Sequence, residues 1–184
     1  MDFKTVLPLI VTDFDAAGVR YALIGGFALG LYGVSRSTVD IDFLAHKEDL
    51  DKIDRVMKKH GYNLEFRSEN VSQFVSPVKL FGEIDFIHAF REISTSMLRR
   101  AVKKSAFGKE LSLKVLTPED IIGLKIQAFK NDASREFRDM ADIDAVIKQY
   151  GPELDWTLLK DYFTLFGLQS RYAQLYEAYG KTKK

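Results

Sequence analysis

Residues 19–45 read VRYALIGGFALGLYGVSRSTVDIDFLA, and the rest of the chain is best understood outward from them. Residues 19–24 are apolar apart from Arg20 and have the length of a buried strand, and a pair of glycines ends it. Residues 27–32 favour a short helix. After a polar loop, residues 39–43 alternate apolar and acidic side chains with the period of a strand, which places the apolar ones in the core. This order of strand, glycine turn, helix and strand predicts an α/β core.

The flanking segments extend this pattern on both sides. A helix is expected from about Thr5–Leu7 to Gly18. The other elements expected before residue 117 are helices over 47–60 and 93–104 and strands over 62–66, 71–75, 78–87 and 111–116. Beyond it every periodic segment is helical: 118–130, 135–150, 156–166 and 168–179. We therefore expect an α/β (α+β) fold, with a small mixed β-sheet flanked by helices over residues 1–116 and a C-terminal helical part over 117–184 that packs on this core.

Composition excludes several classes of protein. The 184 residues include 27 Lys and Arg, 26 Asp and Glu, and no Cys, so the formal net charge is +1. Thiol catalysis, zinc–thiolate sites and disulfides are excluded, and a surface that coats nucleic acid is not indicated. The longest stretch without charge, Tyr21–Ser35, is too short to span a membrane. The first residues carry an acid and no cleavage pattern, so we expect a cytoplasmic protein that does not bind a membrane.

Asp40 and Asp42 are the first residues that suggest chemistry. They lie two apart in a predicted strand, so their side chains project from one face. Two carboxylates this close repel each other unless a cation lies between them. Oxygen ligands of this kind suit Mg²⁺ or Mn²⁺. The alternative is an acidic strand face that is simply solvated.

Three neighbouring features favour the metal site. Gly25 and Gly26 lie between a strand and a helix, where the backbone can approach a phosphate closely. Arg36 lies in the loop that leads to the carboxylates and suits a phosphate contact. A third carboxylate, Asp85, lies in another alternating strand. Glu83 shares the face of Asp85 and is an alternative to it.

In this order, the glycine pair, the run RSTVDIDFL at residues 36–44 and Asp85 resemble the signature of the DNA polymerase β-like nucleotidyltransferase superfamily. The Arg-x-Thr-x-Asp-Ile-Asp wording is most similar to minimal nucleotidyltransferases and to the AbiEii-type toxin enzymes of abortive-infection systems. Lincosamide-type antibiotic nucleotidyltransferases are also similar. The resemblance covers residues 19–45, 78–90 and 116–147.

This resemblance implies a metal-dependent enzyme that moves a nucleoside monophosphate from an NTP, such as ATP, to an acceptor hydroxyl and releases pyrophosphate. The acceptor is a small molecule, a tRNA or a protein. Asp40 and Asp42 would bind two divalent metals, and Asp85 would bind one metal and help to activate the acceptor. The implied nucleotide-binding residues in this half are Gly25, Gly26, Arg36 and Thr38. Many members carry Ser where this chain has Gly26, so only backbone donors remain at that position.

Lys125 is the feature of interest in the helical part. It falls in the middle of the apolar arc of its helix, and Asp139 falls in the apolar arc of the next. One interpretation is that the two pair with each other or that Lys125 reaches solvent along its stem. The other is that Lys125 contacts the nucleotide phosphates, as the matching Lys of the similar toxin enzymes suggests. Arg138 and Asp139 belong to a segment that resembles another motif of that group and are possible supporting residues.

Two other functions remain open on the same residues. One is a non-catalytic module that binds the cognate partner in a toxin–antitoxin pair, although a binding surface has no need of three close carboxylates. The other is a metal-dependent nuclease.

The remaining polar candidates are weaker. The histidines, His46, His60 and His88, are expected at the surface or at strand edges. The basic residues of 99–104 are expected on one helix face, which is either solvated or in contact with RNA or a nucleotide.

Overall fold

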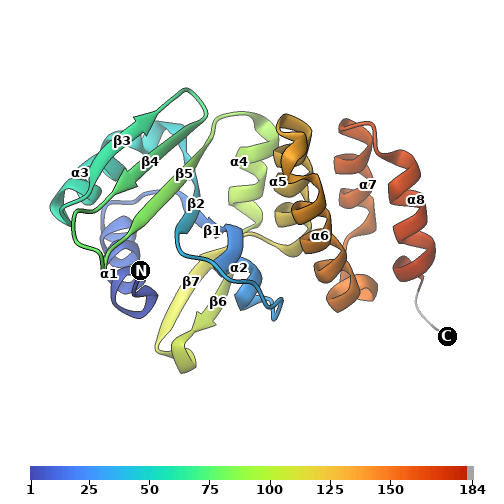
Figure 1. The fold of residues 1–184 in the computed structure, drawn as a ribbon, viewed down its shortest axis with the longest axis horizontal. Helices are drawn as coiled ribbons and strands as arrows, with labels where there is room; N and C mark the ends of the chain where they lie inside the picture. Colours follow the sequence, from blue (N-terminus) through green and yellow to red (C-terminus); the bar gives the residue numbers. More distant parts are fainter. Residues whose placement is uncertain (182–184) are drawn as a thin grey trace. The chain divides into compact units, whose positions relative to one another are not determined.

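The computed structural model describes residues 1–181 apart from the side chain of Lys109; residues 182–184, at the end of the predicted helical part, lie outside it. The described chain forms two compact units (Figure 1). The first comprises residues 1–31 and 35–116, and the second comprises residues 32–34 and the described residues from 117 onward. The first is α/β and the second is helical, so the mixed α/β fold class is confirmed. The packing of one unit on the other remains a prediction.

The first unit contains a seven-stranded mixed sheet with the order β3-β4-β5-β2-β1-β7-β6. Its central strand β2 pairs parallel with β5 and antiparallel with β1. The strands are β1 (Tyr21–Ile24), β2 (Ile41–His46), β3 (Asn63–Arg67), β4 (Val71–Val75), β5 (Glu83–Ala89), β6 (Val102–Ala106) and β7 (Leu111–Val115). The helices are α1 (Phe3–Ala16), α2 (Gly25–Leu31), α3 (Leu50–Lys59) and α4 (Glu92–Arg100).

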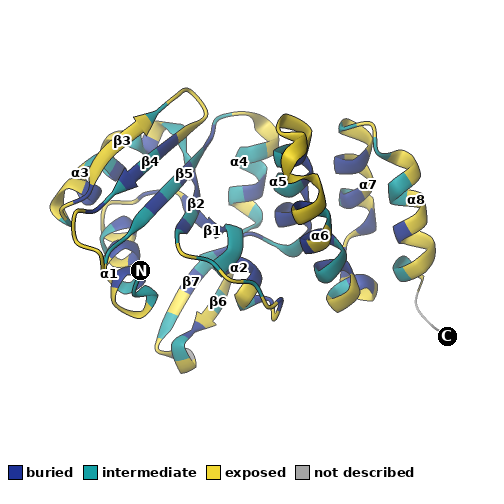
Figure 2. Cartoon of the chain, viewed as in Figure 1, coloured by how far each residue is buried: buried dark blue, intermediate teal, exposed yellow. Residues whose placement is uncertain are grey.

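Aromatic side chains fill the core on one face of this sheet. Phe14 of α1 contacts Phe43 of β2 and Phe86 of β5, with ring centroids 5.7 and 6.0 Å apart. Figure 2 shows the alternation of buried and less buried residues along β4 and β5. Because α1 and the core rings occupy one face, the carboxylates of alternate residues are left on the other.

Several of the predicted boundaries in this unit are wrong, including that of the short helix α2, which begins at Gly25 and not at Phe27. The first helix begins at Phe3, because Asp2 caps it by accepting hydrogen bonds from the backbone N–H groups of Lys4 and Thr5. Strand β2 begins at Ile41, so Val39 is 77% exposed instead of facing the core. Residues 78–82 form a turn, and the strand predicted to start there begins at Glu83.

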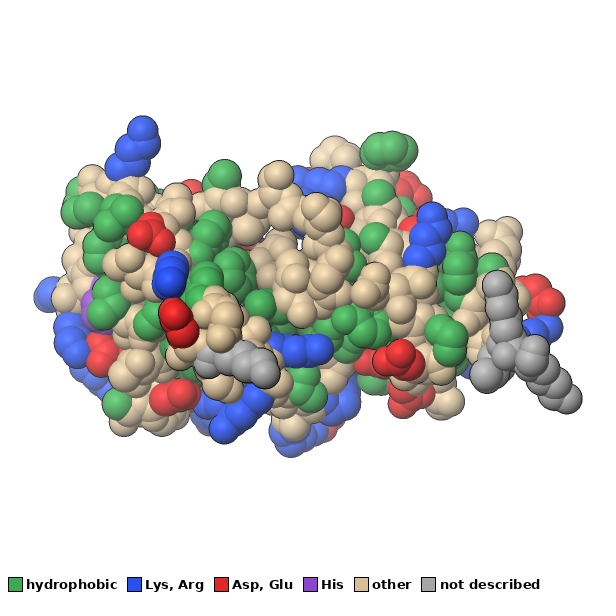
Figure 3. All heavy atoms as spheres, turned by 90° about the horizontal axis from the view of Figure 1, so that it is seen from below, with side chains coloured by type: hydrophobic (Ala, Val, Ile, Leu, Met, Phe, Trp, Pro, Cys, Tyr) green, Lys and Arg blue, Asp and Glu red, His purple; other side chains and the backbone are tan. Residues whose placement is uncertain are grey.

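The helix predicted over 93–104 is also wrong in its second half. It ends at Arg100, and residues 102–106 form β6, which pairs antiparallel with β7. The basic residues of 99–104 therefore do not share a helix face. On the face drawn in Figure 3, basic and acidic side chains are interspersed, as the net charge of +1 suggests.

His88 is buried, contrary to the prediction. Its two ring nitrogens lie 3.0 Å from the Glu69 carbonyl oxygen and 3.0 Å from Ser72 Oγ. With both nitrogens partnered, the imidazole has a structural role in the sheet. Its burial lowers its pKa.

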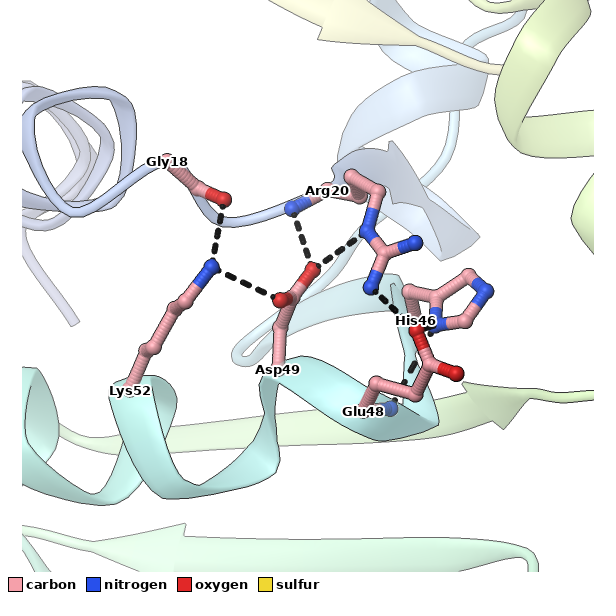
Figure 4. Close-up of polar contacts among 6 residues, drawn as sticks. All are labelled: Gly18, Arg20, His46, Glu48, Asp49 and Lys52. Atoms are coloured by element: carbon pink, nitrogen blue, oxygen red, sulfur yellow. Dashed lines mark hydrogen bonds and ion pairs between the residues drawn. The ribbon is translucent and has the colours of Figure 1, made fainter.

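Asp49 fixes the far end of β2 relative to β1 and α3 (Figure 4). Its buried carboxylate accepts hydrogen bonds from the Arg20 backbone N–H at 3.0 Å and from Arg20 Nε at 2.7 Å, and from Lys52 Nζ at 2.9 Å. Burial raises the pKa of Asp49, but these donors outweigh it and hold the pKa well below its usual range. Asp49 and its partners thus fix the C-terminal end of β2, and Asp42 lies at the N-terminal end of the same strand.

The second unit confirms the predicted helices, with one exception at its end. It contains α5 (Pro118–Asn131), α6 (Glu136–Tyr150), α7 (Trp156–Leu165) and α8 (Gln169–Leu175). The last predicted helix ends early, and residues 176–180 form a π-helical turn. Tyr162 of α7 donates a hydrogen bond to the fully buried Asp120 of α5 at 2.6 Å. Within residues 1–181, no helix combines the length and the apolar character that crossing a bilayer requires.

Candidate active site

The three predicted carboxylates lie together in the first unit. Asp42 on β2 and Asp85 on β5 are directly paired across the parallel ladder, and Asp40 lies in the bend just before β2. One carboxylate oxygen of each residue lies within 4.8 Å of those of the other two. The register of two strands far apart in sequence therefore assembles a cluster of oxygen ligands.

The chemistry of this cluster fits a hard divalent cation. Asp85 Oδ1 is buried and has no hydrogen-bond partner among the described residues. Burial, and then the charges of Glu83, Asp42 and Asp40, raise the pKa of Asp85 to about 7. Such an oxygen lacks a positive or donating partner, and an oxygen-only set suits Mg²⁺ or Mn²⁺.

The glycine pair makes room for these carboxylates. Gly25 has a φ of +68°, and a Cβ built on it would lie 1.9 Å from Asp42 Oδ2. A Cβ on Gly26 would lie 2.7 Å from the Cβ of Thr38. Thr38 Oγ1 in turn donates a hydrogen bond to Asp40 Oδ1 at 2.7 Å. Both glycines are therefore required by close approach, which sequence reasoning had connected only with phosphate binding.

We expect Gly25→Ala to reduce nucleotidyl transfer more than it reduces stability. The new methyl group occupies the position of the Asp42 carboxylate, so that side chain has to turn away from the cluster, and the positive φ adds strain of about 1 kcal/mol. Activity and thermal unfolding measured side by side test this. Gly18→Ala is the matched control, because Gly18 also has a positive φ but nothing within 4 Å of its Cβ position. Equal activity loss in both variants would contradict the role of close approach.

Gln73 is a site residue that sequence reasoning missed. It lies on β4 directly opposite Asp85, and its Nε2 donates a hydrogen bond to Glu83 Oε1. Gln73 also forms a hydrogen bond that counteracts the rise in the pKa of Asp85. Glu83, the alternative to Asp85, is thereby held outside the group of three. Gln73 belongs to no sequence motif, so only the pairing of β4 with β5 identifies it as a neighbour of Asp85.

The raised pKa of Asp85 predicts that metal binding releases a proton. In the metal-free protein the pKa of Asp85 lies above its value in the unfolded chain. The free energy of unfolding therefore falls as pH rises from about 4 to about 7, because Asp85 has to ionise in the folded protein. A cation competes with the proton, and we expect Mg²⁺ uptake near pH 6 to release close to one proton and near pH 9 close to none. Calorimetric titration in buffers of different ionisation enthalpy measures this number.

Asp85→Asn provides the control for this titration. It cannot exchange that proton, so the proton release near pH 6 should disappear together with much of the affinity for the metal. Removing this half-buried charge should also stabilise the metal-free protein near pH 8. Proton release that persists in the variant would assign the titration to another group.

Arg36 and Lys125 differ in what surrounds them. Arg36 is half-buried in the loop before β2, in the same unit as the carboxylates. Lys125 belongs to the second unit, where its Nζ lies 3.1 Å from Asp139 Oδ1 and 2.5 Å from Asp142 Oδ2. These distances support the interpretation in which Lys125 pairs with Asp139. A contact between Lys125 and the nucleotide phosphates remains a prediction.

Asp139 is the centre of this charged network. Its side chain is fully buried, and Arg135 Nε also donates to it at 3.0 Å. Burial raises the pKa of Asp139, but Lys125 and Arg135 outweigh that effect and lower it. Arg138 is exposed on the same helix.

Solved structures of low sequence identity share this fold. ANT(2″)-Ia in complex with adenylyl-2″-tobramycin matches with a TM-score of 0.67 and 13% identity, over 88% of this chain and 97% of that one. An antigenic nucleotidyltransferase-like protein from Paracoccidioides brasiliensis gives 0.58 and 18%, over 96% and 93%. The lincosamide antibiotic adenylyltransferase LnuA, with lincomycin bound, gives 0.53 and 15%, over 78% and 95%. The fold is therefore that of the nucleotidyltransferases.

The chain belongs to the family described as uncharacterised nucleotidyltransferase, whose profile matches residues 5–178. No curated protein matches it by sequence. The resemblance to the polymerase β-like superfamily is thereby confirmed and the protein is a nucleotidyltransferase, whereas a specific closeness to the abortive-infection enzymes remains a prediction.

Proposed function

We propose that this enzyme transfers a nucleoside monophosphate from an NTP to an acceptor hydroxyl, with Mg²⁺ or Mn²⁺ held by Asp40, Asp42 and Asp85. The observation that carries the proposal is the set of three carboxylates within 4.8 Å of one another, one of them with a buried oxygen that no described donor satisfies. A purely structural acidic cluster would leave that oxygen's desolvation uncompensated.

Asp85 and Thr38 have different roles in the proposed transfer reaction. In the transfer, the acceptor oxygen forms a bond to the α-phosphorus while the bond from that phosphorus to the bridging oxygen of the leaving pyrophosphate breaks. Divalent cations, when bound, offset the charge on the attacking and leaving oxygens. Asp85 is the carboxylate to which the acceptor's proton can move. Thr38 orients Asp40 through its hydrogen bond.

Nucleotide binding is assigned to the loop side of the same cluster. The backbone N–H groups of Gly25 and Gly26 and the guanidinium of Arg36 would bind the triphosphate. ATP is the first nucleotide to test, because two of the similar structures carry adenylyl chemistry in their names. The acceptor stays open among a small molecule, a tRNA and a protein.

Incubation with NTPs labelled at the α- or γ-phosphate and a cell extract tests the proposal. We expect Mg²⁺-dependent label from the α-phosphate in an acceptor, none from the γ-phosphate, and loss of transfer with a chelator. Shortened RNA in the same incubation would favour the metal-dependent nuclease. No calorimetric binding of any NTP would favour the non-catalytic module of a toxin–antitoxin pair.

A further inference from the structure

The sheet face that carries Asp85 extends beyond the carboxylates as a half-exposed surface. Side chains alternate strictly along β4 and β5, and those of one face are buried: Ser72, Phe74, Ile84 and Phe86. The intervening residues on the other face are exposed or intermediate: Val71, Gln73, Val75, Glu83, Asp85 and Ile87. These are the residues of one contiguous face, since the register pairs them across the two strands.

This face is unusually apolar for an accessible sheet surface. The solvent side of an antiparallel sheet is normally polar. Here Val71 lies opposite Ile87, and Phe66 of β3 lies opposite Gln73. Phe66 is 54% exposed and Val71 is 36% exposed. Apolar side chains gathered in this way offer a surface on which the apolar side of a ligand can pack.

The apolar face is continuous with the candidate active site. Across the sheet, the register places Phe66 beside Gln73, Gln73 beside Asp85, and Asp85 beside Asp42. A molecule lying on these strands therefore has one end at the carboxylate that we propose receives the acceptor's proton.

The dimensions of the face suit a small molecule. From β5 to β3 it spans two strand spacings, about 10 Å, and from Val71 to Val75 four residue steps, about 13 Å. A stable protein partner needs about 800 Å² on each side, several times this area.

Its charge does not suit a nucleic acid. Of the described strand residues that the register pairs on this face, none is Lys or Arg. Arg67 lies opposite Ser72, on the buried face, and is bound by Asp54. Glu83 accepts a hydrogen bond from Gln73 and forms no ion pair among the described residues. Backbone phosphates would meet carboxylates without the cations that nucleic-acid binding requires.

We propose that this face, made up of Phe66, Val71, Gln73, Val75, Glu83 and Ile87, binds the acceptor, and that the acceptor is a small alcohol with an apolar side and no negative charge. The inference rests on the proposed function. The apolar side packs on Phe66, Val71 and Ile87, and the hydroxyl reaches Asp85.

The test measures which fraction of a cell extract receives label from α-labelled ATP, and how much of that fraction each variant needs for half-maximal transfer. The extract is divided into dialysable small molecules, RNA and protein, and each fraction is offered to the wild type, to Phe66→Ser and to the control Leu9→Ser. Leu9 is 42% exposed on α1, whose core residues pack on the opposite face of the sheet. We expect label in the small-molecule fraction. Phe66→Ser should need about tenfold more of that fraction for half-maximal transfer, with an unchanged requirement for ATP.

The outcomes separate this inference from the proposed function. Label in RNA or protein overturns the acceptor assignment and leaves nucleotidyl transfer intact. Equal acceptor requirements of Phe66→Ser and Leu9→Ser overturn the assigned face. A wild type that labels no fraction contradicts the proposed function, and the acceptor inference falls with it.

Discussion

The double variant Asp40→Asn, Asp42→Asn is expected to lose nucleotidyl transfer by about 10³-fold or more while it unfolds close to the temperature of the wild type. Bound metal contributes several kcal/mol to the transition state, and each 1.4 kcal/mol corresponds to about a factor of ten in rate. Folding should not suffer, because the substitutions remove two like charges held close together. Transfer of α-label and thermal unfolding, measured on the same preparation, test both halves.

Glu83→Gln is the control for this variant. Glu83 shares the sheet face of Asp85 but lies outside the group of three carboxylates, so at saturating acceptor we expect its variant to transfer at a rate within about tenfold of the wild type. Full activity in the double variant would refute the metal assignment. A loss in Glu83→Gln as large as that in Asp85→Asn would instead identify Glu83 as a ligand.

Lys125→Met is expected to destabilise the second unit by about 3–5 kcal/mol. The substitution leaves the carboxylates of Asp139 and Asp142 without their shared cation, and both are buried. Trp156 is the one tryptophan of the chain and lies in α7, so its fluorescence follows the unfolding of this unit in urea.

Lys130→Met is the matched control, since Lys130 is exposed at the end of the same helix and should change stability by no more than about 0.5 kcal/mol. The lowered pKa of Asp139 adds a pH signature. In the wild type its contribution to stability is present above pH 4 or so and is lost as pH falls through the folded-state pKa, so the difference between wild type and Lys125→Met should shrink in acid. Lost activity with unchanged stability would favour the phosphate contact.

Local patterns in the sequence were sufficient for much of the first unit. Alternation of apolar and acidic residues places Asp42 and Asp85 on strand faces away from the core, and the glycine pair marks the end of β1, although both glycines belong to α2 and do not precede it. The apolar arcs of α5 and α6 also single out Lys125 and Asp139, which contact each other.

Several of the misses depend on pairing between distant segments. The sequence of β6 resembles the end of a helix, because its ladder partners lie on β7 and local periodicity does not reveal them. Gln73 and His88 acquire their roles from neighbours across the sheet. Val39 follows the alternation in sequence, yet the chain bends at Asp40 before the ladder begins.

The direct pairing of Asp42 with Asp85 makes catalysis a reporter of strand alignment. A slip of one residue between β2 and β5 would carry Asp85 to the opposite side of the sheet and bring an apolar side chain beside Asp42. Such a chain could keep its helices and its circular dichroism spectrum and yet lack the cation site. Metal uptake during refolding therefore reports when these two strands, whose paired residues Asp42 and Asp85 are 43 positions apart in the sequence, reach their native alignment.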